Sequence, residues 1–334
     1  MRTLEINLTN CNYKIHIERG IIDKISNYLD QNNRYFIITD DGVPFAYTKK
    51  LKEKLINCDV CVVPKGEKSK SLSIYKKVCK ELLKHNYSKS DYIIALGGGV
   101  VGDLAGYVAS TYKRWMKFIN IPTTTLSMVD SSIGGKVALN FEGVKNMIGT
   151  YYHPECVLID PNVLETLPKR HINNGLIEAL KTGIIGDKEL YELFLNNEQL
   201  NNIDEVIYRS LKVKASVVEK DEKELNLRKV LNFGHTFGHA YEAYFKMDEY
   251  LHGESVALGM LTICKNECYY DQLVKILSKM NIKTIPNVNE KMIRKYVGND
   301  KKVSGDMIDI VVVHDIASPI IKSVLIDDVM EYLR

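Results

Sequence analysis

The first half of the chain alternates short, β-branched apolar runs with helical stretches, and no other feature restricts its possible folds as strongly. The runs cover residues 34–39, 60–63, 92–96 and 118–121, and each is stopped by Gly, Pro or Asp. Between the second and third runs, residues 71–84 carry apolar side chains at helical spacing. Strands that alternate with helices predict a parallel sheet covered by helices. Ligands of such sheets bind beyond the carboxyl ends of the strands, so we expect the loops after these runs to form a site.

Long helical segments dominate after about residue 165. They cover residues 174–195, 203–220, 233–245 and 252–270, while 308–313 predicts a returning strand and 327–333 a terminal helix. No Pro- or Ser-rich linker separates the two patterns, so we expect a boundary near Asp160 with a tight interface. The predicted architecture is an α/β, Rossmann-like parallel-sheet domain at residues 1–160 and a mainly α-helical domain at residues 161–334.

Charge and cysteine content argue against several classes of protein. The 45 Lys and Arg residues nearly balance the 42 Asp and Glu residues, and this net charge of +3 disfavours a dedicated nucleic-acid binder. No apolar run approaches the roughly 20 residues that span a bilayer, and the first residues lack the apolar core of a signal peptide. Seven cysteines, an odd number scattered through the chain, favour reduced thiols. We therefore expect a cytoplasmic protein.

A glycine-rich loop follows the third apolar run. Residues 97–102 read GGGVVG, which fits the G-x-G-x-x-G pattern, and they open a helical stretch. Glycines there let backbone N–H groups approach a pyrophosphate at a helix N-terminus, although a tight turn without a ligand would use the same residues. The acidic residues that could grip adenosine hydroxyls, Asp40 and Glu67, lie upstream of the loop. The expected strand order therefore differs from that of a standard dehydrogenase.

Two histidines lie one helical turn apart and a third opens the next helical segment. His235 and His239 are at positions i and i+4, and His252 follows. Imidazoles at this spacing suit Zn²⁺ when a carboxylate completes the set, although they could also be hydrogen-bonded within a helix pair. Thr236 replaces the glutamate of the metalloprotease H-E-x-x-H motif, so peptide hydrolysis is disfavoured. Flanking glycines favour the metal, because glycine in a helix usually admits a close neighbour.

Glu178 is the best candidate carboxylate, because it stands in an otherwise apolar stretch where an acid must be paired or ligated. Lys181 at i+3 offers the alternative of an ordinary helix ion pair. Spacing alone leaves open whether His239 or Glu178 is the third ligand. The cysteine pairs at 58 and 61 and at 264 and 268 are better explained by core packing.

Five basic residues lie in or near the segments that carry these motifs. They are Lys136, Lys145, Lys181, Lys214 and Arg228. Several cations at one cleft suit a substrate with both a phosphate and a carboxylate, whereas single lysines are more often solvated. Lys136 follows two glycines, as in a loop that approaches phosphate, and Arg228 stands two helical turns before His235 if that helix is continuous.

Taken together, seven segments resemble 3-dehydroquinate synthases, a family of sugar phosphate cyclases. They are GGGVVGD (97–103), IPTT (121–124), MVDSSIGGK (128–136), KNMIG (145–149), DE (221–222), LNFGHTFGHA (231–240) and LHGESVA (251–257). The resemblance implies an NAD-binding domain, a helical domain that binds Zn²⁺ or Co²⁺, a cleft between them and a homodimer. It also implies a step of the shikimate pathway, which supplies aromatic amino acids: 3-deoxy-D-arabino-heptulosonate 7-phosphate becomes 3-dehydroquinate and phosphate. The reaction would proceed by transient NAD oxidation, phosphate elimination, re-reduction and intramolecular aldol cyclisation.

The resemblance also implies roles for individual residues. The metal ligands would be Glu178, His235 and His252, so that His239 contacts the substrate. The other catalytic and substrate-binding residues would be Arg114, Asp130, Lys136, Asn146, Lys181, Lys214, Arg228, Asn232 and one of Lys301 or Lys302. The NAD contacts would be Asp40, Glu67, Lys70, Gly98, Gly99, Val100, Val101, Gly102, Asp103, Thr123, Thr124, Lys136, Lys145, Leu164, Glu165 and Thr166. In the family, the arginine matching Arg114 reaches the phosphate across the dimer, but here Trp115 follows where glycine is usual.

Three other functions share part of this pattern. A zinc polyol dehydrogenase related to glycerol dehydrogenases would use NAD and a metal but has no need of the basic set. A sister sugar phosphate cyclase would make an aminocyclitol or valiolone precursor, whereas Asn146 and the basic set favour the dehydroquinate reaction. A non-catalytic NAD sensor would keep the glycine loop but has no need of a complete metal set.

Overall fold

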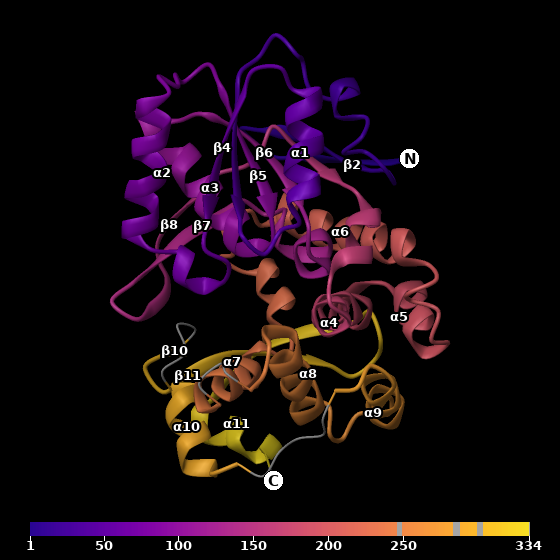
Figure 1. The fold of residues 1–334 in the computed structure, drawn as a ribbon. Helices are drawn as coiled ribbons and strands as arrows, with labels where there is room; N and C mark the ends of the chain where they lie inside the picture. Colours follow the sequence, from indigo (N-terminus) through magenta and orange to yellow (C-terminus); the bar gives the residue numbers. More distant parts are fainter. Residues whose placement is uncertain (246–248, 283–287, 299–302, 334) are drawn as a thin grey trace. The chain divides into compact units, whose positions relative to one another are not determined.

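The computed structural model describes residues 1–245, 249–282, 288–298 and 303–333 and divides into two compact units, Met1–Pro168 and Lys169–Arg334 (Figure 1). Asp160, where we expected the boundary, belongs to the first unit. Its carboxylate accepts hydrogen bonds from the backbone N–H groups of Gly20, at 2.8 Å, and Ile22, at 3.3 Å. Among the described residues, no helix has both the length and the apolar character needed to cross a membrane.

The first unit is built on a seven-stranded sheet with the order β1-β2-β9-β6-β5-β3-β4. All neighbouring strands are parallel except the β1–β2 pair. The strands are β1 (Arg2–Asn7), β2 (Asn12–Ile17), β3 (Tyr35–Asp40), β4 (Cys58–Val63), β5 (Tyr92–Gly97), β6 (Lys117–Pro122) and β9 (Cys156–Ile159), and β7 (Lys136–Phe141) with β8 (Val144–Tyr151) form a separate hairpin. The helices are α1 (Phe45–Lys54), α2 (Leu72–Lys84) and α3 (Gly99–Thr111), with short helical turns η1 (Ile25–Asn27), η2 (Glu67–Ser69), η3 (Tyr112–Arg114), η4 (Ser127–Ser131) and η5 (Pro161–Thr166).

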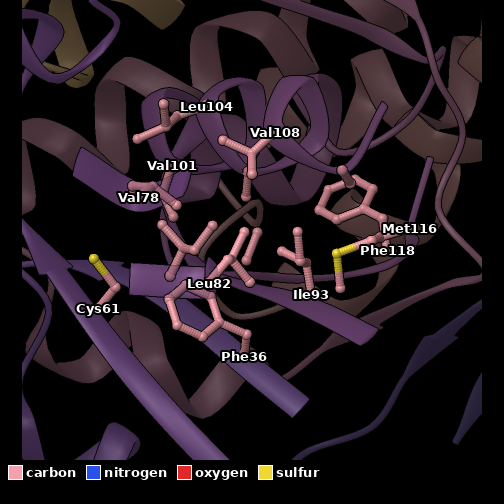
Figure 2. Close-up of a cluster of buried hydrophobic side chains, with 14 of the residues drawn as sticks. Phe36, Cys61, Val78, Leu82, Ile93, Val101, Leu104, Val108, Met116 and Phe118 are labelled. Atoms are coloured by element: carbon pink, nitrogen blue, oxygen red, sulfur yellow. The ribbon is translucent and has the colours of Figure 1, made fainter. Parts of the chain in front are cut away.

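A buried apolar cluster explains why these segments form a helix-covered sheet. Five of the six β3 residues are buried, as expected for a parallel strand that is covered on both faces. Val101, Leu104 and Val108 of α3 belong to one buried cluster with Phe36 and Ile93 of the sheet (Figure 2). All four predicted strands and the predicted helix at residues 71–84 are confirmed.

The strand order reverses direction between β3 and β5. From β3 the chain moves to β4 on one side and then returns to β5 on the other. Right-handed crossovers then place α1 on the opposite face of the sheet from α2 and α3 (Figure 1). The order differs from that of a standard dehydrogenase, as we expected, and the reversal marks where sheets of this kind bind ligands.

The second unit is mainly helical. Its helices are α4 (Lys169–Gly186), α5 (Lys188–Leu195), α6 (Ile203–Lys220), α7 (His235–Tyr244), α8 (His252–Ile263), α9 (Tyr270–Lys279), α10 (Glu290–Gly298) and α11 (Ile326–Val329), with 3₁₀ turns η6 (Leu227–Asn232) and η7 (Met330–Leu333). The strands β10 (Val303–Ser304), β11 (Met307–Val313) and β12 (Pro319–Leu325) form an antiparallel sheet. Two predicted helices were too long. The first breaks at Asp187, whose carboxylate caps α5 by accepting from the N–H of Leu190, and the second ends at Ile263.

Candidate metal centre and nucleotide loop

Three side chains of the helical unit converge on one point. Glu178 lies on α4, whereas His235 and His252 are the first residues of α7 and α8. Oε1 of Glu178 lies 3.7 Å from Nε2 of His235 and 3.4 Å from Nε2 of His252. The donor atoms of these residues lie within 4.8 Å of one another, which makes them the candidate metal ligands among the described residues.

Glycines allow the three helices to approach closely enough for this convergence. A β-carbon on Gly259 would lie 1.9 Å from the carbonyl oxygen of Gly234, and one on Gly253 would lie 2.0 Å from the carbonyl oxygen of Asn174. Gly238 likewise faces the backbone of α8. The close neighbour that the glycines beside the histidines admit is therefore helix backbone. Their packing brings the first turn of α8 against both α4 and α7.

The two histidines are oriented by hydrogen bonds at their other ring nitrogen. Nδ1 of His235 lies 3.1 Å from the carbonyl oxygen of Phe233, and Nδ1 of His252 lies 3.0 Å from Oε1 of Glu242. Both partners can only accept, so Nδ1 carries the proton in each ring. Nε2 is then the nitrogen left to face Glu178 and to bind a metal.

Charge and burial make Glu178 unusual. Its side chain is 1% exposed, and Nζ of Lys181 lies 2.5 Å from Oε2. Burial disfavours its charged form, but Lys181, His235 and His252 outweigh burial and hold the pKa of this carboxyl well below its usual range. Burial and Lys181 lower the pKa of His235 well below its ordinary value. Burial also lowers the pKa of His252, but Glu178 and Glu242 raise it to about 10.

The residues fit a catalytic divalent cation. Both carboxylate oxygens of Glu178 are buried, and neither accepts a hydrogen bond of acceptable geometry from the described residues. A buried carboxylate is costly unless it is paired or binds a metal. Lys181 pairs with Oε2, which leaves Oε1 facing Nε2 of both histidines. One carboxylate oxygen with two imidazole nitrogens is a donor set that zinc uses where a fourth position stays open for substrate.

The other candidate groups of the helical unit lie around this cluster. Lys181 and Lys214 are buried on α4 and α6, which pack together. His239 is exposed, with its ring centroid 5.4 Å from that of His235 and 6.4 Å from that of His252. The structure thus groups Glu178, not His239, with the two other candidate ligands. The candidates Lys301 and Lys302 fall outside the described residues.

Arg228 and Asn232 lie on η6, which is not continuous with α7. The chain turns at Gly234, which has a φ of +75°. Arg228 and His235 are therefore not two turns apart on one continuous helix. The Arg228 side chain is buried, and its guanidinium donates to the carbonyl oxygen of Glu222. The side-chain amide of Asn232 donates to Oε1 of Glu224 at 2.7 Å. No sequence motif points to Glu224.

The glycine loop lies at the strand-order reversal of the first unit. β5 ends at Gly97 beside the end of β3, where Asp40 lies, and Gly98 precedes the first turn of α3. A β-carbon on Gly99 would lie 2.9 Å from Oγ of Ser131, so the loop backbone packs closely. The predicted residues Val100, Val101 and Gly102 lie in that first turn, and Asp103 follows it. At the end of neighbouring β6, the N–H of Thr123 donates to the carbonyl oxygen of Gly97, and Oγ1 of Thr124 lies 2.8 Å from Oγ of Ser127.

A buried lysine links the glycine-loop helix to the β7–β8 hairpin. Nζ of Lys70 donates to Oδ2 of Asp103 at 2.5 Å and to Oδ1 of Asn146. Asn140 completes the network, because its side-chain amide donates to Oε1 of Glu67 at 2.8 Å and its Oδ1 accepts from the N–H of Asn146. No motif pointed to Asn140, which the hairpin register brings beside predicted residues.

The remaining predicted residues of the first unit are spread over its loops and hairpin. Lys136 opens β7 and is exposed, Lys145 lies on β8, and Asp130 lies on η4. Leu164, Glu165 and Thr166 end η5, where Oγ1 of Thr166 lies 2.9 Å from the hydroxyl of Tyr47 on α1. Arg114 has a φ of +80° and is followed by the exposed Trp115, 48% accessible.

Two family models match the chain: 3-dehydroquinate synthase N-terminal at residues 60–174 and 3-dehydroquinate synthase C-terminal at residues 175–303. A curated 3-dehydroquinate synthase of Clostridium botulinum is 39% identical over 98% of this chain and 99% of its own length. The chain belongs to the 3-dehydroquinate synthase family.

Two solved structures also share the fold at a TM-score of 0.87 and 24% identity. One is 2-deoxy-scyllo-inosose synthase complexed with carbaglucose-6-phosphate, NAD⁺ and Co²⁺, matched over 100% of this chain and 99% of that one. The other is 2-epi-5-epi-valiolone synthase from Streptomyces hygroscopicus with NAD⁺ and Zn²⁺, matched over 98% and 97%.

Membership in the 3-dehydroquinate synthase family confirms the resemblance seen in the sequence, the two-part architecture and the expectation of an enzyme. The chain is 39% identical to the Clostridium synthase and 24% identical to each of the two synthases of solved structure.

Proposed function

We propose that this chain catalyses the 3-dehydroquinate synthase reaction, which converts 3-deoxy-D-arabino-heptulosonate 7-phosphate to 3-dehydroquinate and phosphate. The observation that carries the proposal is the buried cluster of Glu178, His235 and His252. It occurs in a chain that is 39% identical to a curated 3-dehydroquinate synthase over nearly its whole length. A protein that only sensed NAD would gain nothing from a buried carboxylate held beside two oriented imidazoles.

The cofactors of the proposed reaction are NAD⁺ and a divalent cation, Zn²⁺ or Co²⁺. Glu178, His235 and His252 would hold the cation, which when bound would lower the pKa of the substrate hydroxyls. The glycine loop and the acids Asp40 and Glu67 would hold NAD⁺, which would take up a hydride and return it, so that the reaction has no net redox change. Two structures with this fold contain NAD⁺ and Co²⁺ or Zn²⁺, which supports the pairing of cofactors.

The basic residues of the helical unit would hold the anionic substrate. Lys181, Lys214 and Arg228 are buried cations, and burial strengthens their attraction for a carboxylate or phosphate because little water screens it. Lys181 also lies against Glu178, so it would place one substrate group beside the cation site. His239 is exposed beside the two candidate histidine ligands, a position from which it could exchange a proton with a substrate hydroxyl.

Further substrate contacts are proposed for other parts of the chain. Asn232 would orient a substrate hydroxyl through its side-chain amide. On the first unit the proposed groups are Asp130, Lys136 and Asn146, with Arg114 as the phosphate contact. The side chain of Asn146 is already held by Lys70, so one of its hydrogen-bonding groups is positioned before substrate arrives.

We also propose that the protein is a cytoplasmic homodimer. The first unit exposes Trp115, Phe141, Val144 and Met147, and large exposed apolar side chains are typical of protein interfaces. Arg114 directly precedes Trp115 in the chain, which is consistent with an arginine that contributes to a neighbouring subunit. All seven cysteines are free thiols, which supports a reducing compartment.

The proposed function is tested with purified protein loaded with Zn²⁺ or Co²⁺. The protein is incubated with NAD⁺ and 3-deoxy-D-arabino-heptulosonate 7-phosphate while free phosphate and NADH absorbance are followed. We expect stoichiometric phosphate release without lasting NADH. Glucose 6-phosphate is the control substrate, because its carba-analogue occupies one of the matched cyclases, and it should release none. NADH accumulation from glycerol without phosphate release would instead indicate a polyol dehydrogenase.

A further inference from the structure

A buried carboxylate from a different helix contacts one of the candidate metal ligands. Glu242 lies on α7 and is 8% exposed, and its Oε1 lies 3.0 Å from Nδ1 of His252 at the start of α8. Glu242 is not among the residues that the sequence motifs single out. A buried acid requires a partner that repays its desolvation, and here a partner is the imidazole N–H.

This contact fixes which nitrogen of His252 faces the cluster. A carboxylate can only accept, so the proton of a neutral His252 ring resides on Nδ1. In the neutral ring that binds a metal, the lone pair is then on the opposite nitrogen, Nε2, which lies 3.4 Å from Oε1 of Glu178. Hydrogen bonding to a carboxylate also makes the other imidazole nitrogen a stronger donor to a metal.

The two candidate histidine ligands are oriented by different means. His235 uses the carbonyl oxygen of Phe233, a backbone group two residues away on its own segment. His252 has an acceptor from another helix, so its orientation depends on one side chain and on the packing of α7 against α8. Glu242 stands seven positions after His235, two helical turns along the same face of α7, which explains how one helix supplies both a ligand and a partner for the other ligand.

We propose that Glu242 is a positioning residue that holds His252 in the tautomer and ring orientation that bind the divalent cation. The inference rests on the proposed function for the identity of the ligands. It adds that a fourth side chain, which contacts no reacting atom, sets the affinity of the site for metal. Substitution of Glu242 can therefore weaken the site without removing a metal ligand, whereas the partner of His235 is a backbone carbonyl that substitution does not remove.

The experiment measures metal affinity directly, without substrate. Zn²⁺ is titrated into the metal-depleted full-length protein in competition with a chromophoric chelator, and the visible absorption spectrum of the Co²⁺ form is recorded. Glu242→Ala should weaken Zn²⁺ binding by about 10–100-fold, the range found when partners of ligating histidines are removed. Glu242→Gln keeps an acceptor oxygen but loses the charge, so its affinity should lie between Glu242→Ala and the wild type. In both variants the Co²⁺ spectrum should change, because the ligand geometry relaxes.

Tyr241→Phe is the matched control. The Tyr241 hydroxyl lies 2.8 Å from Oγ1 of Thr262 and so links α7 to α8 next to Glu242 without touching His252. Its Zn²⁺ affinity and Co²⁺ spectrum should match those of the wild type. Equal losses in Tyr241→Phe and Glu242→Ala would overturn the inference, because they would reflect helix packing alone. Unchanged affinity in both Glu242 variants would overturn it as well.

Failure of the proposed function gives a different result. If the wild type binds Zn²⁺ with an affinity that depends on Glu242 but releases no phosphate from the heptulosonate phosphate, the inference holds and the proposed reaction is wrong. If Glu242→Ala does not fold, Glu242→Gln provides the comparison, because a side chain of nearly the same size and shape can occupy the same space.

Discussion

The candidate metal centre and the glycine loop are built in opposite ways. The loop uses consecutive residues, Gly97 to Gly102, whose backbone groups lie at the end of a strand and the start of a helix. The centre uses side chains from three helices that are far apart in the sequence. Local sequence therefore determines the loop, whereas tertiary packing determines the centre.

The two sites also differ in how they accommodate charge. Asp40 at the loop is half-buried; its desolvation raises its pKa, which the N–H groups of Gly42 and Val43 partly offset. At the centre Glu178 is fully buried, and Lys181, His235 and His252 together offset the cost of burial and keep it ionised. The metal centre depends on each of its charges. Substitutions there should therefore lower the free energy of unfolding more than substitutions at the loop do.

The largest expected effect follows from removing the buried carboxylate of the centre. Glu178→Ala leaves the ammonium of Lys181, 2% exposed, without its partner. Loss of one member of a buried pair costs about 3–5 kcal/mol, so the free energy of unfolding of the metal-free protein should fall by that amount in urea denaturation. The variant should also retain no Zn²⁺ after dialysis and show no turnover.

The double variant Glu178→Ala with Lys181→Met is the control for this prediction. It removes both charges, so it should recover most of the lost stability without recovering metal binding. If Glu178→Ala retained Zn²⁺ at the wild-type level, Glu178 would not be a ligand. If the double variant were no more stable than Glu178→Ala, loss of the ion pair with Lys181 would not explain the destabilisation of the single variant.

A somewhat smaller effect is expected from the glycines that bring the helices together. Gly259→Ala places a β-carbon 1.9 Å from the carbonyl oxygen of Gly234, and this backbone atom cannot move aside as a flexible side chain can. We expect a loss of about 3 kcal/mol, the upper part of the range for overpacking. Gly102→Ala in α3 is the control, because its nearest neighbour outside α3 would lie 3.5 Å away. It should change the free energy of unfolding by no more than about 1 kcal/mol. Equal losses of stability in the two variants would contradict the conclusion that α8 is packed more tightly at Gly259 than α3 is at Gly102.

The sequence predicted the first unit better than the second. Apolar runs stopped by Gly, Pro or Asp identify buried strands, and the four predicted strands begin and end within two residues of the predicted bounds. Helical periodicity does not reveal where two consecutive helices separate. The break at Asp187 depends on its capping bond to Leu190, and the end of α8 at Ile263 likewise went unrecognised.

The candidate site was only partly predictable for the same reason. Spacing identified His235 and His239 on one helix face but could not choose between His239 and Glu178, because Glu178 reaches the cluster from another helix. Glu242 and Asn140 went unnoticed because each matters through a contact across elements. Periodicity reports only which residues of one helix share a face, and it is silent on what that face meets.

A smaller effect is expected at the loop. Lys70 is 4% exposed and bonds to Asp103, whose side chain is 22% exposed and can be solvated when the lysine is lost. Lys70→Met should therefore lower the free energy of unfolding by about 1.5 kcal/mol, the lower end for hydrogen bonds that involve charge. Lys68→Met, at a neighbouring exposed position, should have no measurable effect in the same urea titration. A loss as large as that of Glu178→Ala would remove the proposed difference between the two sites.

The smallest effect concerns acid sensitivity in the helical unit. Asp221 accepts from the N–H groups of Leu225, Asn226 and Arg228 at 2.9, 2.7 and 2.9 Å and so orders the turn that carries Arg228. Its slight burial opposes ionisation, but these hydrogen bonds outweigh it and lower its pKa from the ordinary 3.8. The unfolded chain therefore binds a proton at higher pH than the folded protein does. The stabilisation is complete above the ordinary pKa and is lost as pH falls through the lowered one.

Urea unfolding between about pH 5 and pH 3 should show a smaller loss of stability for Asp221→Asn than for the wild type, because the variant has no carboxylate to protonate. Parallel losses in the two proteins would mean that the turn is held by its other contacts.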